Sequence, residues 1–193
     1  MNELLDVSRI RAGRLQLDLE PADLVDVVRD VGERFRDASG VARAGCEVRM
    51  ELPDCVIGRW DRTRLEQIVE NLLSNAVKYG AGKPVTVKLA CSASSAVLTV
   101  VDHGIGISSE DRARIFERFE RAVSARHFGG MGVGLYVVRQ VVQALGGTVD
   151  VESEPAGGSQ FIVTLPLAGP AESFAPVAHA DAAGQGMREE TRH

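Results

Sequence analysis

The sequence predicts an α/β (α+β) domain, because segments with a helical period and segments with a strand period follow one another along the chain. The longer segments repeat their apolar residues every three to four positions, which is the spacing of one face of a helix. The shorter segments are rich in β-branched residues or alternate between apolar and polar side chains, which is typical of half-buried strands. With 193 residues, the chain is long enough for one domain with a substantial core and some appendages.

The most informative helical pattern runs from Asp61 to Tyr79 and carries two stripes. At 100° per residue, its apolar side chains form one broad stripe with the spacing of a buried face. These side chains are Leu65, Ile68, Val69, Leu72, Leu73 and Ala76. A narrow stripe beside it carries Asn71, Asn75 and Lys78, and Gln67 extends it toward the N-terminus. Amide oxygens suit a hard cation such as Mg²⁺ and an ammonium suits phosphate, so this polar stripe is a candidate metal and phosphate site.

Further elements are expected on both sides of this helix. Amphipathic helices are predicted over residues 22–38 and 135–145, and a short helical piece over 108–120. The expected strands are 46–52, 55–60, 85–90, 97–101, 148–152 and 160–165. Strands 85–90 and 97–101 are expected to form one hairpin, and strands 148–152 and 160–165 another.

The boundaries of these elements follow from their end residues. Residues 1–17 start inside a helical pattern that Gly13 weakens, and Glu20-Pro21 reads as a break. Either Asp61 or Thr63 can cap the central helix, because both are good N-cap residues. That helix is expected to end at its following glycines, Gly80 and Gly82.

Composition and charge exclude several classes of protein. The net charge of -5 argues against a protein that binds nucleic acid by bulk electrostatics. No apolar run approaches the roughly 20 residues of a membrane helix, and no signal peptide opens the chain. The three cysteines form no CxxC pair and the four histidines lack metal-ligand spacing, which indicates a reducing, cytoplasmic compartment and no disulfide frame or zinc site.

Two glycine-containing motifs add to the polar stripe. In DHGIGI, residues 102–107, a carboxylate at a strand end is followed by Gly104 and Gly106, which allow a backbone to come close to a flat ligand. Asp102 can accept a hydrogen bond there, for example from an exocyclic amine. In GMGVGL, residues 130–135, a glycine run opens a helix, and the free N–H groups of a helix start favour phosphate. Each motif alone is a weak signal, because turns and hinges use the same residues.

The order of these pieces resembles the ATP-binding catalytic domain of bacterial two-component sensor histidine kinases, within the gyrase, Hsp90 and MutL type of ATPase. NLLSNAVKY at 71–79 looks like the N box, and DHGIGI looks like the first glycine box. IFERF at 115–119 looks like the F box, and GMGVGL looks like the second glycine box. The segment LLDVSRIRAGRLQLDLEPADL is similar to the junction that leads from a phosphoacceptor helix into this domain.

The resemblance implies a fold and a division of the chain. The family fold is a two-layer sandwich of the Bergerat type, in which a mixed, mostly antiparallel sheet covers three helices and nucleotide lies between the helices and a mobile lid. Residues 1–20 would then be the end of the dimerisation and phosphoacceptor helix with its junction, and 21–167 the ATP-binding domain. Residues 168–193, which contain little bulky apolar content, are expected to form a disordered tail.

The resemblance also assigns roles to individual residues. Asn75 would be the Mg²⁺ ligand, while Asn71, Lys78 and Arg121 would act on the phosphates. Asp102 would take the adenine amino group. The other expected nucleotide contacts are Tyr79, Gly104, Gly106, Ile107, Phe119, Gly130, Gly132, Val133, Gly134 and Leu135. Phe116 and Phe119 would anchor the lid. His103 and Glu120 depart from the residues most common at their positions in the family.

One further position separates phosphoryl transfer from hydrolysis. In the gyrase-like hydrolases a glutamate four residues before the motif asparagine activates water, whereas here that residue is Asn71. An amide cannot act as a general base, so transfer of the γ-phosphoryl group to a histidine is favoured over hydrolysis. None of the four histidines lies in an H-E/D-x-x-x-P context, so the acceptor is expected on a phosphoacceptor domain outside this chain.

The expected partners are ATP or ADP, Mg²⁺, that phosphoacceptor domain and a response regulator. The isolated domain is expected to be a monomer and the parent kinase a homodimer. Two alternatives stay open: a serine-phosphorylating anti-sigma-type kinase with the same fold, and a nucleotide-binding regulatory module without turnover.

Overall fold

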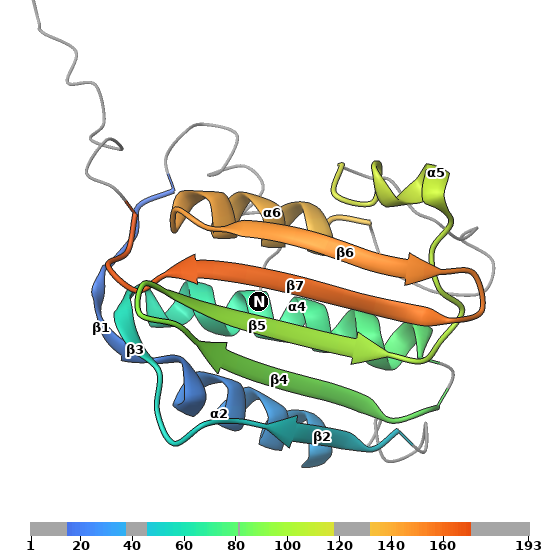
Figure 1. Cartoon of the computed structure of the whole chain (residues 1–193), viewed down its shortest axis with the longest axis horizontal. Coiled ribbons are helices and arrows are strands. Elements are labelled where there is room, and N and C mark those ends of the chain that lie inside the picture. Colours follow the sequence, from blue (N-terminus) through green and yellow to red (C-terminus); the bar gives the residue numbers. More distant parts are fainter. Residues whose placement is uncertain (1–14, 38–45, 81, 118–131, 171–193) are drawn as a thin grey trace, which may run out of the picture.

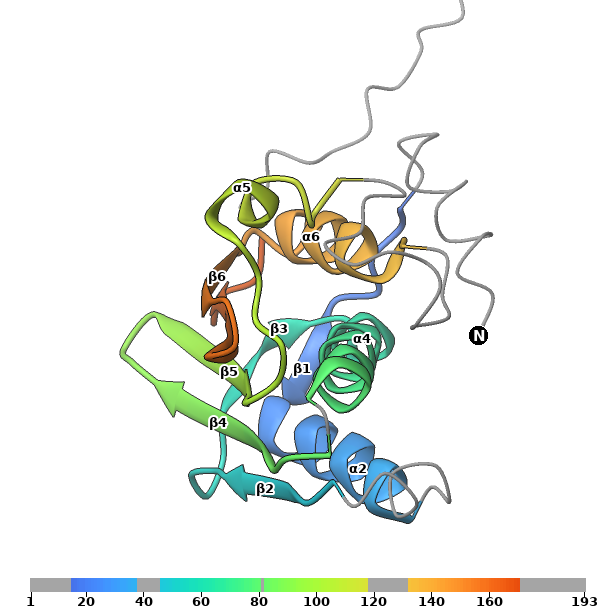
Figure 2. The same ribbon diagram turned by 90° about the vertical axis from the view of Figure 1, so that its right-hand side faces the viewer.

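The computed structural model describes residues 15–37, 46–80, 82–117 and 132–170, and these form two layers (Figure 1). One layer is a five-stranded sheet with the strand order β2-β4-β5-β7-β6. The other consists of the helices α2, α4 and α6, which all lie on the same side of the sheet, as the side view in Figure 2 shows. The expected two-layer sandwich is confirmed.

The sheet is mixed but mostly antiparallel, as predicted. β2 (Val48–Glu51) runs parallel to β4 (Val85–Cys91), whereas every other neighbouring pair is antiparallel. β4 and β5 (Ser95–Asp102) form one predicted hairpin, and β6 (Thr148–Glu154) and β7 (Gly158–Pro166) form the other. β5 and β7 pair side by side in the middle of the sheet, which brings two distant parts of the sequence together.

The central helix of the second layer is α4 (Arg62–Tyr79), which contacts both α2 (Leu24–Asp37) and α6 (Gly134–Ala144). All six residues of its predicted apolar stripe are buried, so the periodicity identified the core face correctly. The N-cap of α4 is Asp61 rather than Thr63, because an oxygen of the Asp61 carboxylate accepts a hydrogen bond from the backbone N–H of Arg64 at 3.1 Å.

The prediction fails at the N-terminal side. Glu20-Pro21 is not a break but the start of β1 (Glu20–Asp23), which pairs with β3 (Ile57–Trp60) as a small second sheet. A proline is compatible with such an edge position because its missing N–H can face away from the partner strand. The helical pattern predicted at the start of the chain, up to Gly13, lies outside the described part and stays a prediction, and residues 15–19 form no helix.

Helix α2 starts two residues later than expected, and its start has a local cause. One oxygen of the Asp23 carboxylate accepts hydrogen bonds from the backbone N–H groups of Val25 and Val56, both at 2.9 Å. This carboxylate therefore caps α2 and ties it to the approach of β3. The short helix predicted over 108–120 reduces to α5 (Ser109–Arg112) followed by turns, and residues from 118 onward lie outside the described part.

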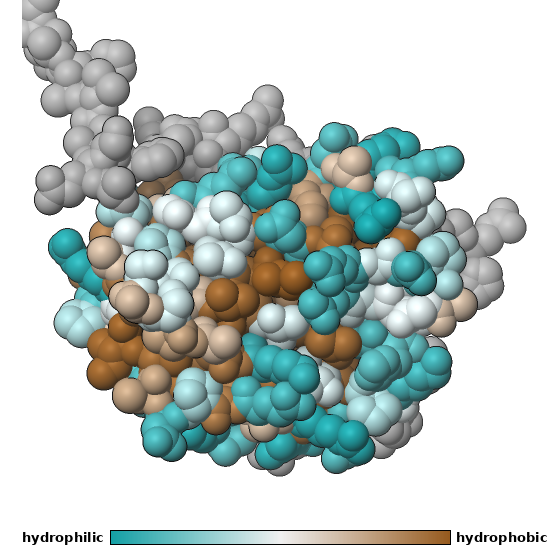
Figure 3. Space-filling view, viewed as in Figure 1, coloured by the Kyte–Doolittle hydropathy of each residue, from teal (hydrophilic) through white to brown (hydrophobic). Residues whose placement is uncertain are grey.

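The helix-free face of the sheet carries an area of hydrophobic surface bordered by hydrophilic side chains (Figure 3). In β5 the buried Ala96, Leu98 and Val100 alternate with half-buried residues, and alternation places the half-buried set on this outer face. The chain's three cysteines are all free thiols. Across the described ranges we find neither a helix that could cross a membrane nor a cluster of metal-ligating side chains.

Candidate nucleotide site

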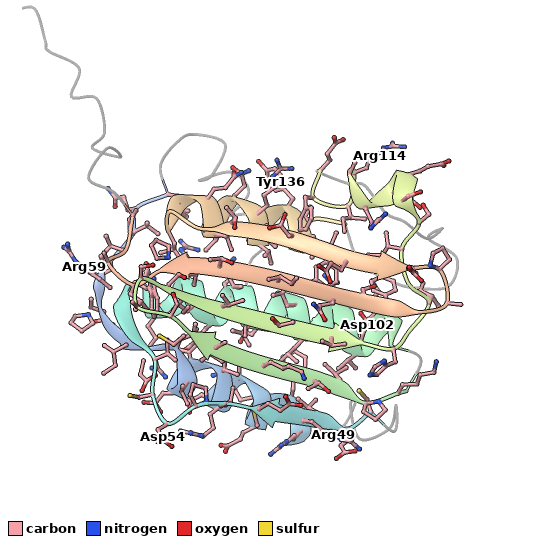
Figure 4. The ribbon with its side chains drawn as sticks, in the orientation of Figure 1. Arg49, Asp54, Arg59, Asp102, Arg114 and Tyr136 are labelled. Atoms are coloured by element: carbon pink, nitrogen blue, oxygen red, sulfur yellow. The ribbon has the colours of Figure 1, made fainter. Side chains whose placement is uncertain are left out.

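Asp102 lies at the end of β5, where it is one of the few buried charged residues (Figure 4). Its side chain is 4% exposed, and one carboxylate oxygen accepts a hydrogen bond from the backbone N–H of Gly104 at 2.9 Å. Burial raises the pKa of this carboxyl, while hydrogen bonds from Gly104 and Ser159 counteract part of the rise. The molecule thus keeps a polar acceptor inside its hydrophobic layer, which normally costs stability unless a hydrogen bond compensates for it.

The partner of Asp102 on β7, Ser159, was missed by the sequence analysis. The two residues are directly opposite each other in the β5–β7 ladder, and Ser159 is 7% exposed. Its hydroxyl also lies 3.1 Å from the hydroxyl of Ser153 on β6. The Ser153 hydroxyl donates to the carbonyl of Gly158 at 2.6 Å and accepts from the backbone N–H of Ile107 at 2.8 Å. These serines fix the end of the predicted DHGIGI turn.

The turn from Asp102 to Ile107 lies directly against the C-terminal end of α4. The backbone N–H of Ile105 donates to the carbonyl of Tyr79 at 3.3 Å. A side chain on Gly104 would overlap with the same Tyr79 carbonyl, so only glycine permits this approach. Gly106 has a φ of +68°, in the left-handed region that favours glycine. Both glycines singled out from the sequence are therefore required by the backbone path.

The polar stripe of α4 lies beside its buried face: Asn71, Asn75 and Lys78 are half-buried, and Gln67 is buried. The Asn71 amide N–H donates back to the Gln67 carbonyl at 2.9 Å, which leaves the side-chain oxygen of Asn71 directed elsewhere. The side chain of Asn75 makes no hydrogen bond within the described part of the chain. Lys78 has no ion pair with any described residue, and its ammonium lies 4.8 Å from the centre of the Tyr79 ring. Asn75 and Lys78 thus have polar groups available to a ligand.

The start of α6 meets this stripe. A Cβ atom placed on Gly134 would lie 2.7 Å from the side-chain oxygen of Asn71, so a side chain at this position would require the Asn71 side chain to shift. Val133 is the N-cap of α6 and makes no side-chain cap hydrogen bond, because valine has no side-chain acceptor. The first N–H groups of the helix therefore lack the usual side-chain cap. Gly132 precedes Val133 with a φ of +68°. Leu135 is half-buried in the first turn.

The structure therefore brings most of the predicted site residues to one side of α4. Asp102, Gly104 and Tyr79 meet at its C-terminal end, and Asn71 meets Gly134 two turns earlier. Gly106, in the same turn as Gly104, lies against the carbonyl of Glu154. Phe119, Arg121 and Gly130 lie outside the described residues. Phe116, the first aromatic of the predicted F box, packs edge-on against Phe161 of β7 with ring centroids 6.5 Å apart.

The carboxylates of α4 point away from this side. Glu70 forms an ion pair with Arg34 of α2 at 2.9 Å. Glu66 lies 3.6 Å from Arg34 and 3.4 Å from Arg62. Because α2 and α6 contact α4 separately, these contacts keep both glutamates among the cations on the α2 side. Both glutamates are therefore engaged by arginines on the side of α4 that faces α2.

The comparison with family models decides the classification. Residues 60–169 match the family described as histidine kinase-, DNA gyrase B-, and HSP90-like ATPase. The chain belongs to this family. The matched range contains α4, the Asp102 turn and the start of α6, which are the elements that form the candidate site.

Curated relatives indicate where within the family the chain falls. It is 35% identical over 174 residues to the sensor histidine kinase MtrB of Mycolicibacterium paratuberculosis, a match that covers 86% of this chain and 30% of MtrB. It is 31% identical over 170 residues to the alginate biosynthesis sensor protein KinB of Pseudomonas aeruginosa, covering 86% of this chain and 28% of KinB. The chain thus spans less than a third of each of these relatives.

Solved structures agree with this placement. Full-length ShkA in complex with AMPPNP superposes with a TM-score of 0.77 and 30% identity, covering 88% of this chain and 35% of ShkA. The mycobacterial sensor histidine kinase MprB gives a TM-score of 0.66 and 31% identity, covering 79% of this chain and 98% of that chain. This member of the ATPase family is thus an ATP-binding catalytic domain of the sensor histidine kinase type.

Proposed function

We propose that this domain binds Mg-ATP and donates the γ-phosphoryl group to a histidine on a separate phosphoacceptor domain, in two-component signal transduction. One observation carries the proposal: the buried Asp102 turn lies at one end of the polar stripe of α4, and the start of α6 meets that stripe further along. From Asn71 to Gly80 the helix rises by roughly 13 Å. An extended nucleotide could lie along this length of α4, with its base at the Asp102 turn and its phosphates near the start of α6.

The base end of the proposed site is the Asp102 turn. The carboxylate of Asp102 would accept the hydrogen bonds of the adenine amino group, directly and through water. Gly104 and Gly106 would let the ring approach the backbone, and Tyr79 and Ile107 would flank the base or sugar. The sequence match to nucleotide-binding relatives supports this assignment, and so does the burial of Asp102.

The phosphate end would be formed by α4 and α6. Asn75 fits a Mg²⁺ ligand because its half-buried amide makes no hydrogen bond in the described part of the chain and its oxygen is a hard donor. Bound Mg²⁺ would neutralise charge on the phosphates. Asn71 and Lys78 would contact the same phosphates, as would the N–H groups at residues 132–135. By resemblance, Phe119, Arg121 and Gly130 complete this end, although they lie outside the described residues.

The proposed reaction is transfer rather than hydrolysis. A nitrogen of the acceptor histidine would attack the γ-phosphorus, the bond from that phosphorus to the bridging oxygen would break, and ADP would leave. Efficient hydrolysis needs a general base for water, and Asn71 is an amide while Glu66 and Glu70 are engaged on the α2 side. Lys78 and Arg121 would stabilise the transferred charge, and catalysis would rest on positioning.

The relatives also suggest partners. Because MtrB and KinB are named as sensor proteins, we propose that a response regulator receives the phosphoryl group from the histidine. This domain would act in the cytoplasm, where ATP is available, and would be a monomer when isolated. The parent kinase would be a homodimer, which a segment outside this sequence could anchor to a membrane. The division at residues 20 and 167 stays a prediction.

Calorimetry with ADP and AMPPNP, with and without Mg²⁺, tests the binding part. We expect Mg²⁺-dependent binding of the ATP analogue that is lost in Asn75→Ala, and loss of both ligands in Asp102→Ala. Asp54→Ala is the matched control, because Asp54 is an exposed carboxylate at the other end of the molecule (Figure 4). If Asp102→Ala binds as the wild type does, the base assignment is wrong, and if the wild type binds neither nucleotide the proposal fails.

Radiolabelling separates the transfer alternatives. The chain is incubated with [γ-³²P]ATP, with and without a phosphoacceptor domain taken from a sensor histidine kinase. We expect acid-labile, alkali-stable label on the added domain only. Acid-stable label would favour the serine-kinase alternative, and equal label on this chain in both reactions would contradict the absence of an acceptor. Binding without any transfer would favour the regulatory module.

A further inference from the structure

A groove lies on the opposite side of α6 from the candidate nucleotide site. It has a volume of about 610 Å³ and is bounded by α5 with its following turn, by the C-terminal half of α6 and by the start of β6. Figure 2 shows these three elements around one another at the top of the molecule. Gly134, which meets Asn71, is about five residues and so roughly 8 Å along α6 from Arg139, the first groove residue of that helix.

The groove combines an apolar floor with positive charge that has no partner among the described residues. Phe116, Val149 and Val151 line it, and Phe116 is held in place by its edge-on contact with Phe161. Arg112 of α5 and Arg139 of α6 also line it, and neither guanidinium has an ion pair or side-chain hydrogen bond within the described ranges. Asp150 is the one acidic residue among the described lining residues. The two arginines against this one aspartate leave a positive lining on a chain whose net charge is -5.

The third wall of the groove is an unpaired strand edge. β6 is the last strand of the five-stranded sheet, so in the described part of the chain β7 is its only partner. Half of the N–H and C=O groups of an edge strand point away from its neighbour. Over Thr148–Val151 none of these groups takes part in a backbone hydrogen bond outside the β6–β7 ladder within the described ranges. Backbone donors and acceptors are therefore open along the groove.

The neighbouring side chains specify what kind of strand would fit. Along β6 the half-buried Val149 and Val151 face the helix layer, whereas the side chains of the exposed Thr148, Asp150 and Glu152 alternate toward the outer side of the sheet. Thr148 and Asp150 therefore bound the groove at its rim rather than at its floor. A strand added to β6 would place alternate residues on these two sides. Its groove-facing residues would meet valine, phenylalanine and two guanidiniums. Its outer residues would lie beside Asp150 and Glu152, where a carboxylate is disfavoured.

We propose that this groove docks an extended segment of a partner protein, which pairs with the free edge of β6. The groove-facing residues of that segment are acidic and apolar, and its outer residues are neutral or basic. Backbone pairing supplies affinity and the alternate side chains supply selectivity, as in other cases of strand addition to a sheet edge. The acidic residues form charge-assisted hydrogen bonds with Arg112 and Arg139.

A pair of peptides with equal composition tests this docking. The probe is the fluorescein-labelled peptide Thr-Glu-Lys-Leu-Thr-Glu-Lys, whose glutamates and leucine share one face. In the control peptide Thr-Lys-Glu-Leu-Thr-Lys-Glu the acidic and basic residues exchange faces while the net charge is unchanged. We expect the probe to bind at least tenfold more tightly in fluorescence anisotropy and to shift the NMR amide signals of Thr148–Val151. Equal affinity of the two peptides, or no binding of the probe at millimolar concentration, would overturn the proposal.

Variants of the protein locate the contact. The double variant Arg112→Gln/Arg139→Gln is expected to lower the affinity for the probe at least tenfold, because each charge-assisted hydrogen bond normally contributes about that factor. Arg49→Gln is the matched control: Arg49 lies on β2, the opposite edge strand, and is exposed there (Figure 4). Unchanged affinity in the double variant contradicts the site, as does an equal loss in Arg49→Gln.

A probe methylated on the backbone nitrogens of alternate residues separates strand pairing from simple charge attraction. Such a peptide keeps its side chains but cannot donate to the β6 edge, so we expect its binding to be lost when the donating nitrogens are blocked. If both possible sets of methylated nitrogens leave the affinity unchanged, strand pairing is refuted. Since the groove and the nucleotide site are on different sides of α6, ADP binding measured alongside stays at the wild-type level in the arginine variants.

Discussion

At the scale of single residues, Asp102 combines burial with a requirement for charge. Burial raises its pKa, and the hydrogen bonds from Gly104 and Ser159 oppose that rise without abolishing it. A protonated carboxyl would lose part of its capacity to accept hydrogen bonds from an amino group. The polar surroundings of Asp102 are therefore as important to the proposed base recognition as the carboxylate itself.

Replacing Asp102 by asparagine tests that requirement. The amide oxygen can still accept from the Gly104 N–H, so the turn should persist, but the other amide atom becomes a donor that faces the adenine amino group. We expect ADP affinity to fall roughly 10- to 150-fold, the equivalent of one charge-assisted hydrogen bond of about 1.5–3 kcal/mol. Calorimetry measures the affinity, and the amide NMR spectrum confirms that the fold is retained. Wild-type affinity in this variant would remove Asp102 from the proposed site.

The folding stability and the ADP affinity of the wild type should change with pH in opposite directions. Because the folded-state pKa of Asp102 lies above its unfolded-state value, the folded protein binds this proton more tightly. Relative to Asp102→Asn, the stability of the wild type should therefore fall as the pH rises from the usual range of aspartate through the raised pKa, and then level off. ADP affinity should rise over the same range, because binding needs the carboxylate. Urea unfolding and calorimetry at several pH values measure the two trends, and parallel trends would contradict the assignment.

At the scale of elements, α4 carries its core-packing residues and its candidate site residues on adjacent faces. Its apolar stripe is buried, its glutamates Glu66 and Glu70 contact α2 through Arg34, and its Asn71 amide faces the start of α6. One helix therefore fixes the position of the site relative to the core. A shift of α6 by even a fraction of a turn would move Gly134 away from Asn71.

The contact between Gly134 and Asn71 can be tested by a double-mutant cycle. Alanine at position 134 would favour the helix by up to about 1 kcal/mol on propensity alone, but its Cβ would lie 2.7 Å from the Asn71 side-chain oxygen. We therefore expect Gly134→Ala to destabilise the wild type and to be neutral or stabilising in Asn71→Ala. A coupling of at least about 0.5 kcal/mol in urea unfolding is expected. Additive effects would mean that the side chains adjust without strain.

Sequence periodicity predicted α4, its buried stripe and both hairpins correctly, because in these elements the local sequence pattern and the tertiary packing favour the same structure. β1 was missed because Pro21 signals a break, and only its pairing with β3 makes it a strand. Ser159 was missed because its contact with Asp102 depends on the register of β5 against β7, which no local pattern encodes. The ligand contacts assigned to the individual site residues stay predictions, and Phe119, Arg121 and Gly130 lie outside the described residues.

Asp61 connects two elements through one buried carboxylate. One oxygen accepts from the Arg64 N–H at 3.1 Å and the other from the Asp18 N–H at 3.0 Å, so the carboxylate joins α4 to the preceding chain segment. Asp61→Ala should cost about 0.5–2 kcal/mol as a lost cap alone. Asp61→Asn can keep the cap but replaces the acceptor facing Asp18 by a donor. Hydrogen exchange should quicken at Asp18 in both variants and at Arg64 only in the alanine variant, and equal protection in all three proteins would contradict the link.

At the scale of the whole molecule, both sheets and all three long helices share one hydrophobic core. Trp60 contributes to its closure, since this fully buried residue of β3 donates a hydrogen bond from its indole nitrogen to the carbonyl of Pro166 at 2.8 Å. The neighbouring N–H of Arg59 donates to the carbonyl of Leu167 at 2.8 Å. The small β1–β3 sheet is thereby attached to the end of β7, a distant part of the chain.

A single core predicts a single cooperative unfolding transition, and Trp60 provides the probe. As the only tryptophan, it reports on the β1–β3 corner by fluorescence, while far-UV circular dichroism reports on the helices and sheet together. The two urea curves should coincide if the corner unfolds with the rest of the molecule. In Trp60→Phe the carbonyl of Pro166 loses its donor inside the protein, so circular dichroism should show a loss of about 1–3 kcal/mol with an unchanged urea dependence. Non-coincident wild-type curves would mean that the corner is a separate unit, and in that case the substitution would leave the main transition where it was.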